Sequence, residues 1–153
     1  VAPRPPEPAA GLLISEYVEG SALNKAIEIF NPGTAAVDLA TYTLRLYSNG
    51  SATATASFVL SGTLAPGAVA VIYNPGFALP AIPDGALVSG GVINFNGDDA
   101  LTLETNGVVV DQFGQVGLDP GTAWISGALT TLDRTLRRKP GIVRGSVPPA
   151  APT

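Results

Sequence analysis

The sequence predicts an all-β protein, and three observations point to that class. Eighteen glycines and fourteen prolines are spread along the 153 residues, an interruption about every eight to twelve residues that is typical of many short strands. Valine and threonine are abundant, whereas lysine and glutamate, which favour helices, are scarce. No stretch shows convincing helical periodicity beyond one or two turns.

Alternation of apolar and polar residues places the expected strands along the chain. They span 12–18, 26–31, 42–49, 53–60, 68–74, 100–105, 108–114 and 134–139, with one further short strand within 77–91. The Asn106-Gly107 pair marks the clearest hairpin turn, whereas residues 115–131 are expected to be irregular. About seven to nine short antiparallel strands with one apolar face predict an immunoglobulin-like β-sandwich, with a closed barrel as the alternative.

Proline- and alanine-rich stretches flank this region on both sides. Residues 1–11 and 145–153 are expected to be linkers, and residues 12–144 to form the folded domain. Because the chain begins without methionine and without a signal pattern, we expect a processed or excised part of a longer polypeptide.

Composition excludes several kinds of chemistry. The chain contains neither histidine nor cysteine, which rules out a Ser-His-Asp triad, a thiol nucleophile and any zinc site built from those residues. Only a mechanism based on carboxylates, lysine or tyrosine stays open. The net charge of −4 provides no overall field that attracts nucleic acid. No apolar run approaches the roughly 18 residues that a membrane span requires.

The first expected hairpin concentrates acidic residues. Glu16, Glu19 and Glu28 lie near Lys25 in the sequence, and a symmetric register sets Glu16 opposite Glu28. Like charges in that position are unfavourable, so we expect a cation beside them, supplied by Arg45 or Lys25. The alternative is that these carboxylates gather a divalent cation or act as a catalytic pair. Cross-strand pairing on a solvent face is the favoured interpretation.

A second polar group precedes the strand at 100–105. Asn96, Asp98 and Asp99 supply the oxygen ligands that calcium prefers, although the spacing lacks the pattern of an EF-hand. The same residue types form local turns that start strands. A turn is therefore the first interpretation of this segment, and a calcium site is the second. We expect that the domain requires no cofactor, and that Ca²⁺ is the ion that the loop would bind if it binds one.

The last expected strand is rich in basic residues. Arg134, Arg137, Arg138 and Lys139 could contact the phosphates of a nucleic acid even in an acidic domain. They could equally neutralise nearby aspartates and protect a sheet edge from unwanted pairing. The single tryptophan, Trp124, is expected to anchor a loop or the core.

In series, the segments "LLISEYVEGSALNKAIEIFNP", "LRLYSNG", "NFNGDDALTL" and "RTLRRK" resemble the bacterial lamin-tail domain over residues 12–139. The residues that match its opening hairpin are Glu16, Glu19, Asn24, Lys25, Glu28 and Asn31. Those that match its Asn-Gly-Asp-Asp motif and its closing basic strand are Asn96, Gly97, Asp98, Asp99, Arg137 and Arg138.

The resemblance implies an immunoglobulin-like fold and a non-catalytic accessory or interaction module. Bacterial domains of this kind are often found in large secreted or surface proteins, frequently beside a nuclease domain, and the related domain of nuclear lamins binds proteins and DNA. We therefore expect an extracellular or cell-surface location, with other domains of the same polypeptide and DNA or another polyanion as partners. Two alternatives are a metal-dependent phosphodiesterase that uses carboxylates and a calcium-stabilised structural module.

Overall fold

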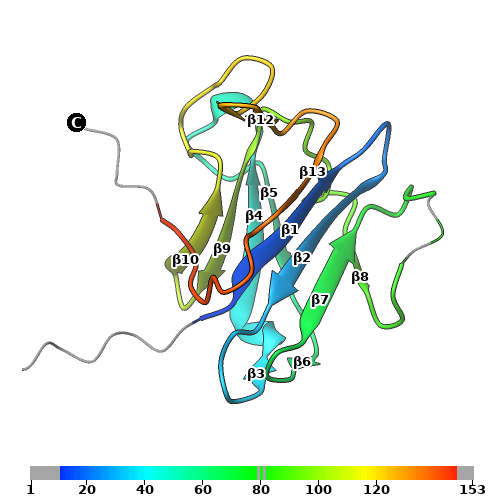
Figure 1. The fold of residues 1–153 in the computed structure, drawn as a ribbon, viewed down its shortest axis with the longest axis vertical. Helices are drawn as coiled ribbons and strands as arrows, with labels where there is room; N and C mark the ends of the chain where they lie inside the picture. The colour runs from blue at the N-terminus through cyan, green and yellow to red at the C-terminus, as the bar shows by residue number, and fades with distance from the viewer. Residues whose placement is uncertain (1–10, 79, 81, 148–153) are drawn as a thin grey trace, which may run out of the picture.

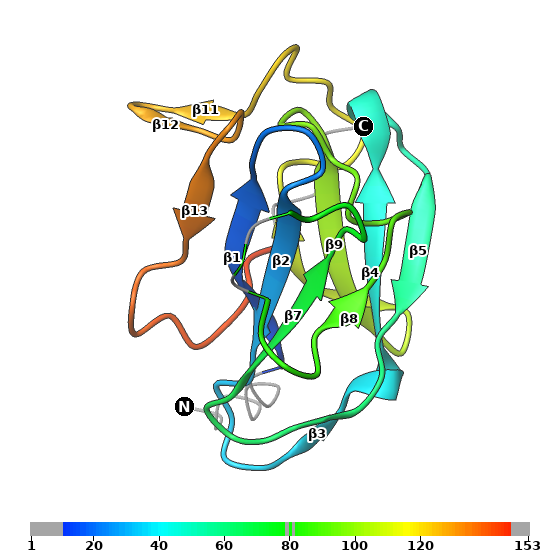
Figure 2. The same ribbon diagram turned by 90° about the vertical axis from the view of Figure 1, so that its right-hand side faces the viewer.

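A computed structural model describes residues 11–78, 80 and 82–147 of the protein. Of the expected linkers at 1–11 and 145–153, residues 1–10 and 148–153 lie outside the described residues. The described chain forms two β-sheets that stack face to face (Figures 1 and 2). The immunoglobulin-like β-sandwich expected from the sequence is thereby confirmed.

The first sheet has the strand order β13-β1-β2-β7-β8. In that order its strands are Thr135–Arg137, Leu13–Glu19, Lys25–Phe30, Val69–Tyr73 and Leu87–Val88. Its neighbouring strands are antiparallel except β7 and β8, which are parallel. The last strand of the domain, β13, thus lies at an edge of this sheet, beside β1.

The second sheet has the strand order β10-β9-β4-β5 and is antiparallel throughout. In that order its strands are Val108–Phe113, Ala100–Thr105, Tyr42–Tyr47 and Ala56–Val59. The β9–β10 hairpin confirms the turn expected at Asn106-Gly107, whose φ angles of 51° and 74° place both residues in the left-handed region. Asparagine and glycine tolerate that region, which the tightest hairpin turns require.

Smaller elements close the ends of the sandwich. The strand pairs are β3 (Val37–Asp38) with β6 (Thr63–Leu64) and β11 (Ile125–Ser126) with β12 (Leu129–Thr130). The single helical turns are η1 (Leu39–Thr41) and η2 (Ser48–Gly50). The expectation that 115–131 is irregular was therefore wrong at β11 and β12, because strands of two residues are too short to show alternation.

The core lies between the two sheets and is mostly aliphatic. Tyr17 of β1 is its largest fully buried side chain, and its ring stacks between those of Phe95 and Phe113, with centroid distances of 4.6 and 4.2 Å. The fully buried aliphatic residues around it include Leu12, Ile27, Ile29, Leu44, Ile72, Ile93, Leu101 and Leu103. Each such side chain contributes about 1.5–3 kcal/mol on burial, which makes this core the main source of stability.

Two Asn-Pro-Gly turns are built in the same way. The Oδ1 atoms of Asn31 and Asn74 accept hydrogen bonds from the N–H groups of Gly33 and Gly76, at 2.9 and 2.8 Å. Both asparagines are buried, and their side-chain amides donate to backbone carbonyls of neighbouring segments. Each turn therefore fixes a strand end without leaving a buried polar atom unsatisfied.

Candidate functional site

The acidic hairpin has the register expected from its sequence. Glu16 of β1 lies directly opposite Glu28 of β2, with a bulge in β1 between Ile14 and Glu16. The cation beside Glu16 is Arg137 of β13, whose Nε lies 3.1 Å from Glu16 Oε1. Glu28 instead accepts a hydrogen bond of 2.7 Å from Ser15 Oγ. An arginine does pair with Glu16, but it comes from β13, more than a hundred residues later in the chain.

Neither Arg45 nor Lys25 lies beside the Glu16–Glu28 pair, so the choice of these two cations for that pair was wrong. Arg45 belongs to β4 of the other sheet, where its Nε lies 2.7 Å from Glu104 Oε2; this bond and the charge of Glu104 raise the pKa of Arg45. Lys25 points into the sandwich, and its Nζ lies 2.5 Å from Oε1 of Glu19. Alternation already indicates this placement, since Lys25 is in phase with the buried Ile27 and Ile29.

Glu19 and Lys25 form a buried ion pair at one end of the hairpin. They are cross-strand partners, and their exposed fractions are 4% and 6%. The second carboxylate oxygen of Glu19 accepts a hydrogen bond from the backbone N–H of Asp133, just before β13. The pair therefore ties the β1–β2 hairpin to the segment that leads into the closing strand, and neither side chain is presented to a ligand.

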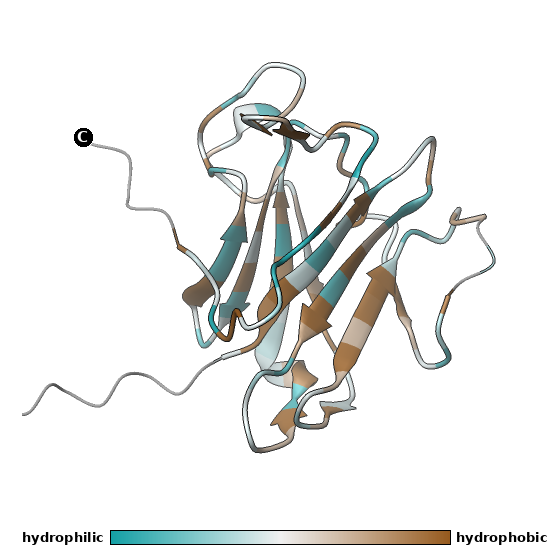
Figure 3. Cartoon of the chain, in the orientation of Figure 1, coloured by the Kyte–Doolittle hydropathy of each residue, from teal (hydrophilic) through white to brown (hydrophobic). Residues whose placement is uncertain are grey.

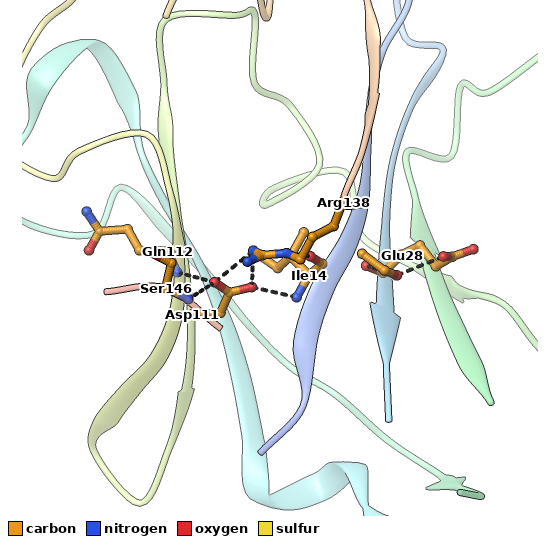
Figure 4. A network of polar contacts seen from close by, with 7 residues as sticks. Ile14, Glu28, Asp111, Gln112, Arg138 and Ser146 are labelled. Atoms are coloured by element: carbon orange, nitrogen blue, oxygen red, sulfur yellow. Dashed lines mark hydrogen bonds and ion pairs between the residues drawn. The ribbon is translucent and has the colours of Figure 1, made fainter. Parts of the chain in front are cut away.

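Arg138 of the basic strand is also part of the fold. Its Nη2 lies 2.7 Å from Oδ2 and 2.9 Å from Oδ1 of Asp111 in β10, and its Nε donates to the carbonyl of Ile14 at 2.9 Å (Figure 4). Asp111 is completely buried. Its carboxylate also accepts the backbone N–H groups of Ile14, Gln112 and Ser146, at 2.7, 3.0 and 2.8 Å. We call this network the Asp111–Arg138 clasp.

The clasp lies beside irregularities in the backbone hydrogen-bond ladders of β1 and β10. β1 has a bulge after Ile14 and β10 has one between Val109 and Asp111, and bulges leave backbone groups without ladder partners. Beside these bulges, the Asp111 carboxylate accepts the N–H of Ile14 and the Arg138 guanidinium donates to the carbonyl of Ile14, and so they join β10 of one sheet to β1 of the other. The clasp also holds Ser146, two residues beyond the boundary placed at residue 144.

The other basic residues of this strand point outward. Arg134, Arg137 and Lys139 are exposed, and the Arg137 side chain keeps 77% of its surface although it pairs with Glu16. Arg134 donates from Nη1 to the backbone carbonyl of Asp133. The sequence predicted one common role for these four cations. In the structure, Arg138 is part of the fold and the other three point outward. Contact with nucleic acid stays a prediction.

The Asn-Gly-Asp-Asp segment forms the expected turn before β9. Asp99 is buried, and its carboxylate accepts the backbone N–H groups of Asn49 at 2.9 Å and Asn96 at 3.2 Å. With its amide nitrogen facing the carboxylates, the Asn96 side chain donates to Asp99 Oδ2 at 3.1 Å and Asp98 Oδ1 at 2.5 Å. Trp124 anchors the same turn, because its indole N–H donates to the carbonyl of Asp99 at 2.8 Å.

Within residues 11–78, 80 and 82–147, no three acidic residues gather closely enough to hold a metal ion. The three predicted calcium ligands, Asn96, Asp98 and Asp99, do lie side by side, and calcium binding by them stays a prediction. In the same described ranges, no helix has the length and apolar character needed to cross a membrane.

Comparison with known families decides what kind of domain this sandwich is. The model of the lamin tail domain family matches residues 5–117, well over half of the chain. The chain belongs to the lamin tail domain family. A search of curated proteins found no match. Lamin tail domains are non-catalytic modules with an immunoglobulin-like fold. The match ends soon after β10, so β13 and the clasp arginine of this lamin tail domain lie beyond it.

The buried carboxyl of Asp99 is expected to make the stability of this lamin tail domain depend on pH. Burial, reinforced by the neighbouring charge of Asp98, raises the pKa of the Asp99 carboxyl above its ordinary value of 3.8. Just above pH 3.8 the unfolded chain has released the proton that the folded chain still holds, so the contribution of Asp99 to stability falls as pH rises. The decline ends once the raised pKa has been passed.

We therefore expect the stability advantage of the wild type over an Asp99→Asn variant to shrink as pH increases from about 4 to about 7. The measurement is the free energy of unfolding in urea for both proteins across that range. The variant is expected to be the weaker fold throughout, because one face of its amide can no longer accept an N–H group. An advantage that grows with pH would contradict this account of Asp99.

Proposed function

We propose that this lamin tail domain is an accessory module of a larger secreted or cell-surface protein, with an extracellular nuclease as the parent. Family membership supports a non-catalytic role. The internal carboxylates Glu19, Asp99 and Asp111 are engaged with backbone N–H groups, Lys25 or Arg138, which is the behaviour of structural residues. The chemistry of the parent would then reside in another domain.

Within that parent, the module would bring a polyanion such as DNA to its neighbour. The observation that carries this proposal is the group of exposed cations in and beside the edge strand β13: Arg134, Arg137 and Lys139. Arg138 does not belong to the binding set, because it is engaged in the clasp. With few phosphate contacts and a net charge of −4, binding would be weak and sensitive to salt.

The test is a fluorescence anisotropy titration of a labelled duplex DNA with the purified domain at several salt concentrations. Three phosphate contacts predict that affinity falls about 40-fold between about 50 and about 200 mM salt. Replacing Arg134, Arg137 and Lys139 by glutamine should remove most of the binding at low salt. Arg45→Gln, which removes a cation from the opposite sheet, is the matched control and should leave binding unchanged.

If the domain does not bind the duplex DNA at low salt, the proposed role in DNA binding is wrong. Binding that the triple variant retains would place the contact elsewhere and contradict the assignment to this strand. A catalytic domain in the same reading frame would support the accessory role independently of the DNA titration.

A further inference from the structure

The face of the five-stranded sheet that points away from the core carries several apolar side chains. Cross-strand partners form three rows on this face. On either side of a central row that contains Glu16 and Glu28, the cross-strand partners of β1, β2 and β7 are apolar: Leu13, Phe30 and Val69 in one row and Val18, Ala26 and Tyr73 in the other. Leu13 and Ala26 are themselves buried, so the accessible apolar surface comes from the other four. Figure 3 shows this apolar character along β7 and its alternation with polar residues along β2.

A groove of about 470 Å³ runs over this face. Its floor is formed by β1, β2 and β7, and the segment after β7 adds a wall with Phe77, Ile82 and Pro83. The rings of Tyr73 and Phe77 meet edge to face, with centroids 6.4 Å apart. Aliphatic and aromatic side chains thus surround a strip of carboxylates, an arrangement suited to a ligand with both apolar and charged parts.

The groove carries more negative than positive charge. Its central row reads Arg137, Glu16, Glu28 and Val71 across four strands, so that two carboxylates face one guanidinium. Arg137 pairs with Glu16. Among the described residues no cation lies within ion-pair distance of Glu28, whose hydrogen-bond donor is the neutral hydroxyl of Ser15. Opposed like charges cost stability, and a cation that settled over Glu28 would relieve that cost.

We propose that this groove binds an extended peptide segment of a partner domain, which lays one lysine or arginine side chain over Glu28 between apolar neighbours. The aliphatic stem of that side chain packs on Val71 and Tyr73 while its charged end reaches the carboxylate. The neighbouring peptide side chains occupy the apolar rows on either side. Nucleic acid does not suit this face, since phosphates would meet two carboxylates. The proposal shares Arg137 with the DNA contact proposed for the edge strand, but it rests on Glu28 and its test contains no DNA.

The test is an NMR titration of the ¹⁵N-labelled domain with three blocked peptides, Ser-Thr-Val-Arg-Val-Thr-Ser and its analogues with glutamine or glutamate at the centre. The arginine peptide should shift the backbone amide signals of β1, β2 and β7 in a saturable way, and the glutamine peptide should bind at least tenfold more weakly. The glutamate peptide should not bind. Binding of the arginine peptide should fall as salt is added.

Glu28→Gln is the decisive variant, because it keeps the shape of the groove and removes its unpaired charge. It should weaken binding of the arginine peptide at least fivefold and leave the glutamine peptide unaffected, with a melting temperature no lower than that of the wild type. Glu104→Gln, the same change at a carboxylate paired with Arg45 on the other sheet, is the matched control and should bind like the wild type.

Three results would overturn the proposal. The first is equal binding of the arginine and glutamine peptides, or no saturable binding of either. The second is unchanged affinity in Glu28→Gln. The third is saturation of the same amide signals by Ca²⁺ alone without any response to the arginine peptide, which would make the carboxylate pair a metal site.

Discussion

Asp111→Ala is expected to lower the free energy of unfolding by about 3–5 kcal/mol, because it breaks the clasp at its completely buried carboxylate. The change leaves the Arg138 guanidinium beside buried backbone without its carboxylate. It also removes the acceptor of three backbone N–H groups, those of Ile14, Gln112 and Ser146. A loss of this size is a large fraction of the stability of an ordinary domain, about 5–15 kcal/mol.

The measurement is urea unfolding, followed by the fluorescence of Trp124 and by circular dichroism. Asp84→Ala is the matched control, because Asp84 is exposed and makes no hydrogen bond or ion pair with another described residue. It should change the free energy of unfolding by less than about 0.5 kcal/mol. If Asp111→Ala proved as mild as Asp84→Ala, the clasp would not hold the two sheets together.

The second large effect is expected at the other end of the hairpin. Lys25→Met keeps an unbranched apolar stem beside Phe95 but leaves the carboxylate of Glu19 buried without its cation. Breaking a buried ion pair by removing one partner costs about 3–5 kcal/mol. Urea unfolding of the variant at neutral pH measures this loss.

A double variant separates the ion pair from mere packing. Glu19→Gln combined with Lys25→Met removes both charges and keeps an amide oxygen for the backbone N–H of Asp133. Since a buried pair can often be replaced at little cost, the double variant should be more stable than Lys25→Met alone. If the double variant is less stable than both Glu19→Gln and Lys25→Met, the charges of the ion pair themselves stabilise the fold, even inside the sandwich.

Local sequence signals predicted the parts of this fold that are formed by neighbouring residues. The β9–β10 hairpin follows from Asn106-Gly107, whose residue types match the left-handed turn. The opposition of Glu16 and Glu28 follows from the symmetric pairing of two adjacent alternating strands. In both cases the partners are close in the chain, so the pattern itself carries the pairing.

The ion-pair partners of the charged residues could not be predicted from the local sequence in the same way. Glu16 pairs with Arg137 only because β13 returns to the edge of the first sheet, which no local pattern encodes. Arg45 follows the hairpin in sequence but belongs to the other sheet. At Asp111 the bulge in β10 interrupts the alternation after Val109, so the pattern did not predict the complete burial of this charged residue.

The same limit applies to the candidate sites. The basic composition of residues 134–139 predicted a common role for four cations, because composition cannot distinguish a guanidinium that faces solvent from one that reaches across to Asp111. Lys25 was the exception that the sequence could have revealed, since it shares the phase of Ile27 and Ile29. The groove depends on three strands and a loop at once, and only the folded chain brings them together.

Arg138 belongs to the fold because it joins the closing segment of the chain to Asp111, whereas DNA binding by the outward cations is a proposal. A double-mutant cycle of Asp111→Asn and Arg138→Gln tests the structural role of Arg138 directly, with urea unfolding of the two single variants, the double variant and the wild type. We predict a coupling energy of at least about 2 kcal/mol, because the two side chains act as one unit. A coupling energy below about 0.5 kcal/mol, with additive losses, would contradict the clasp and return Arg138 to the outward cations.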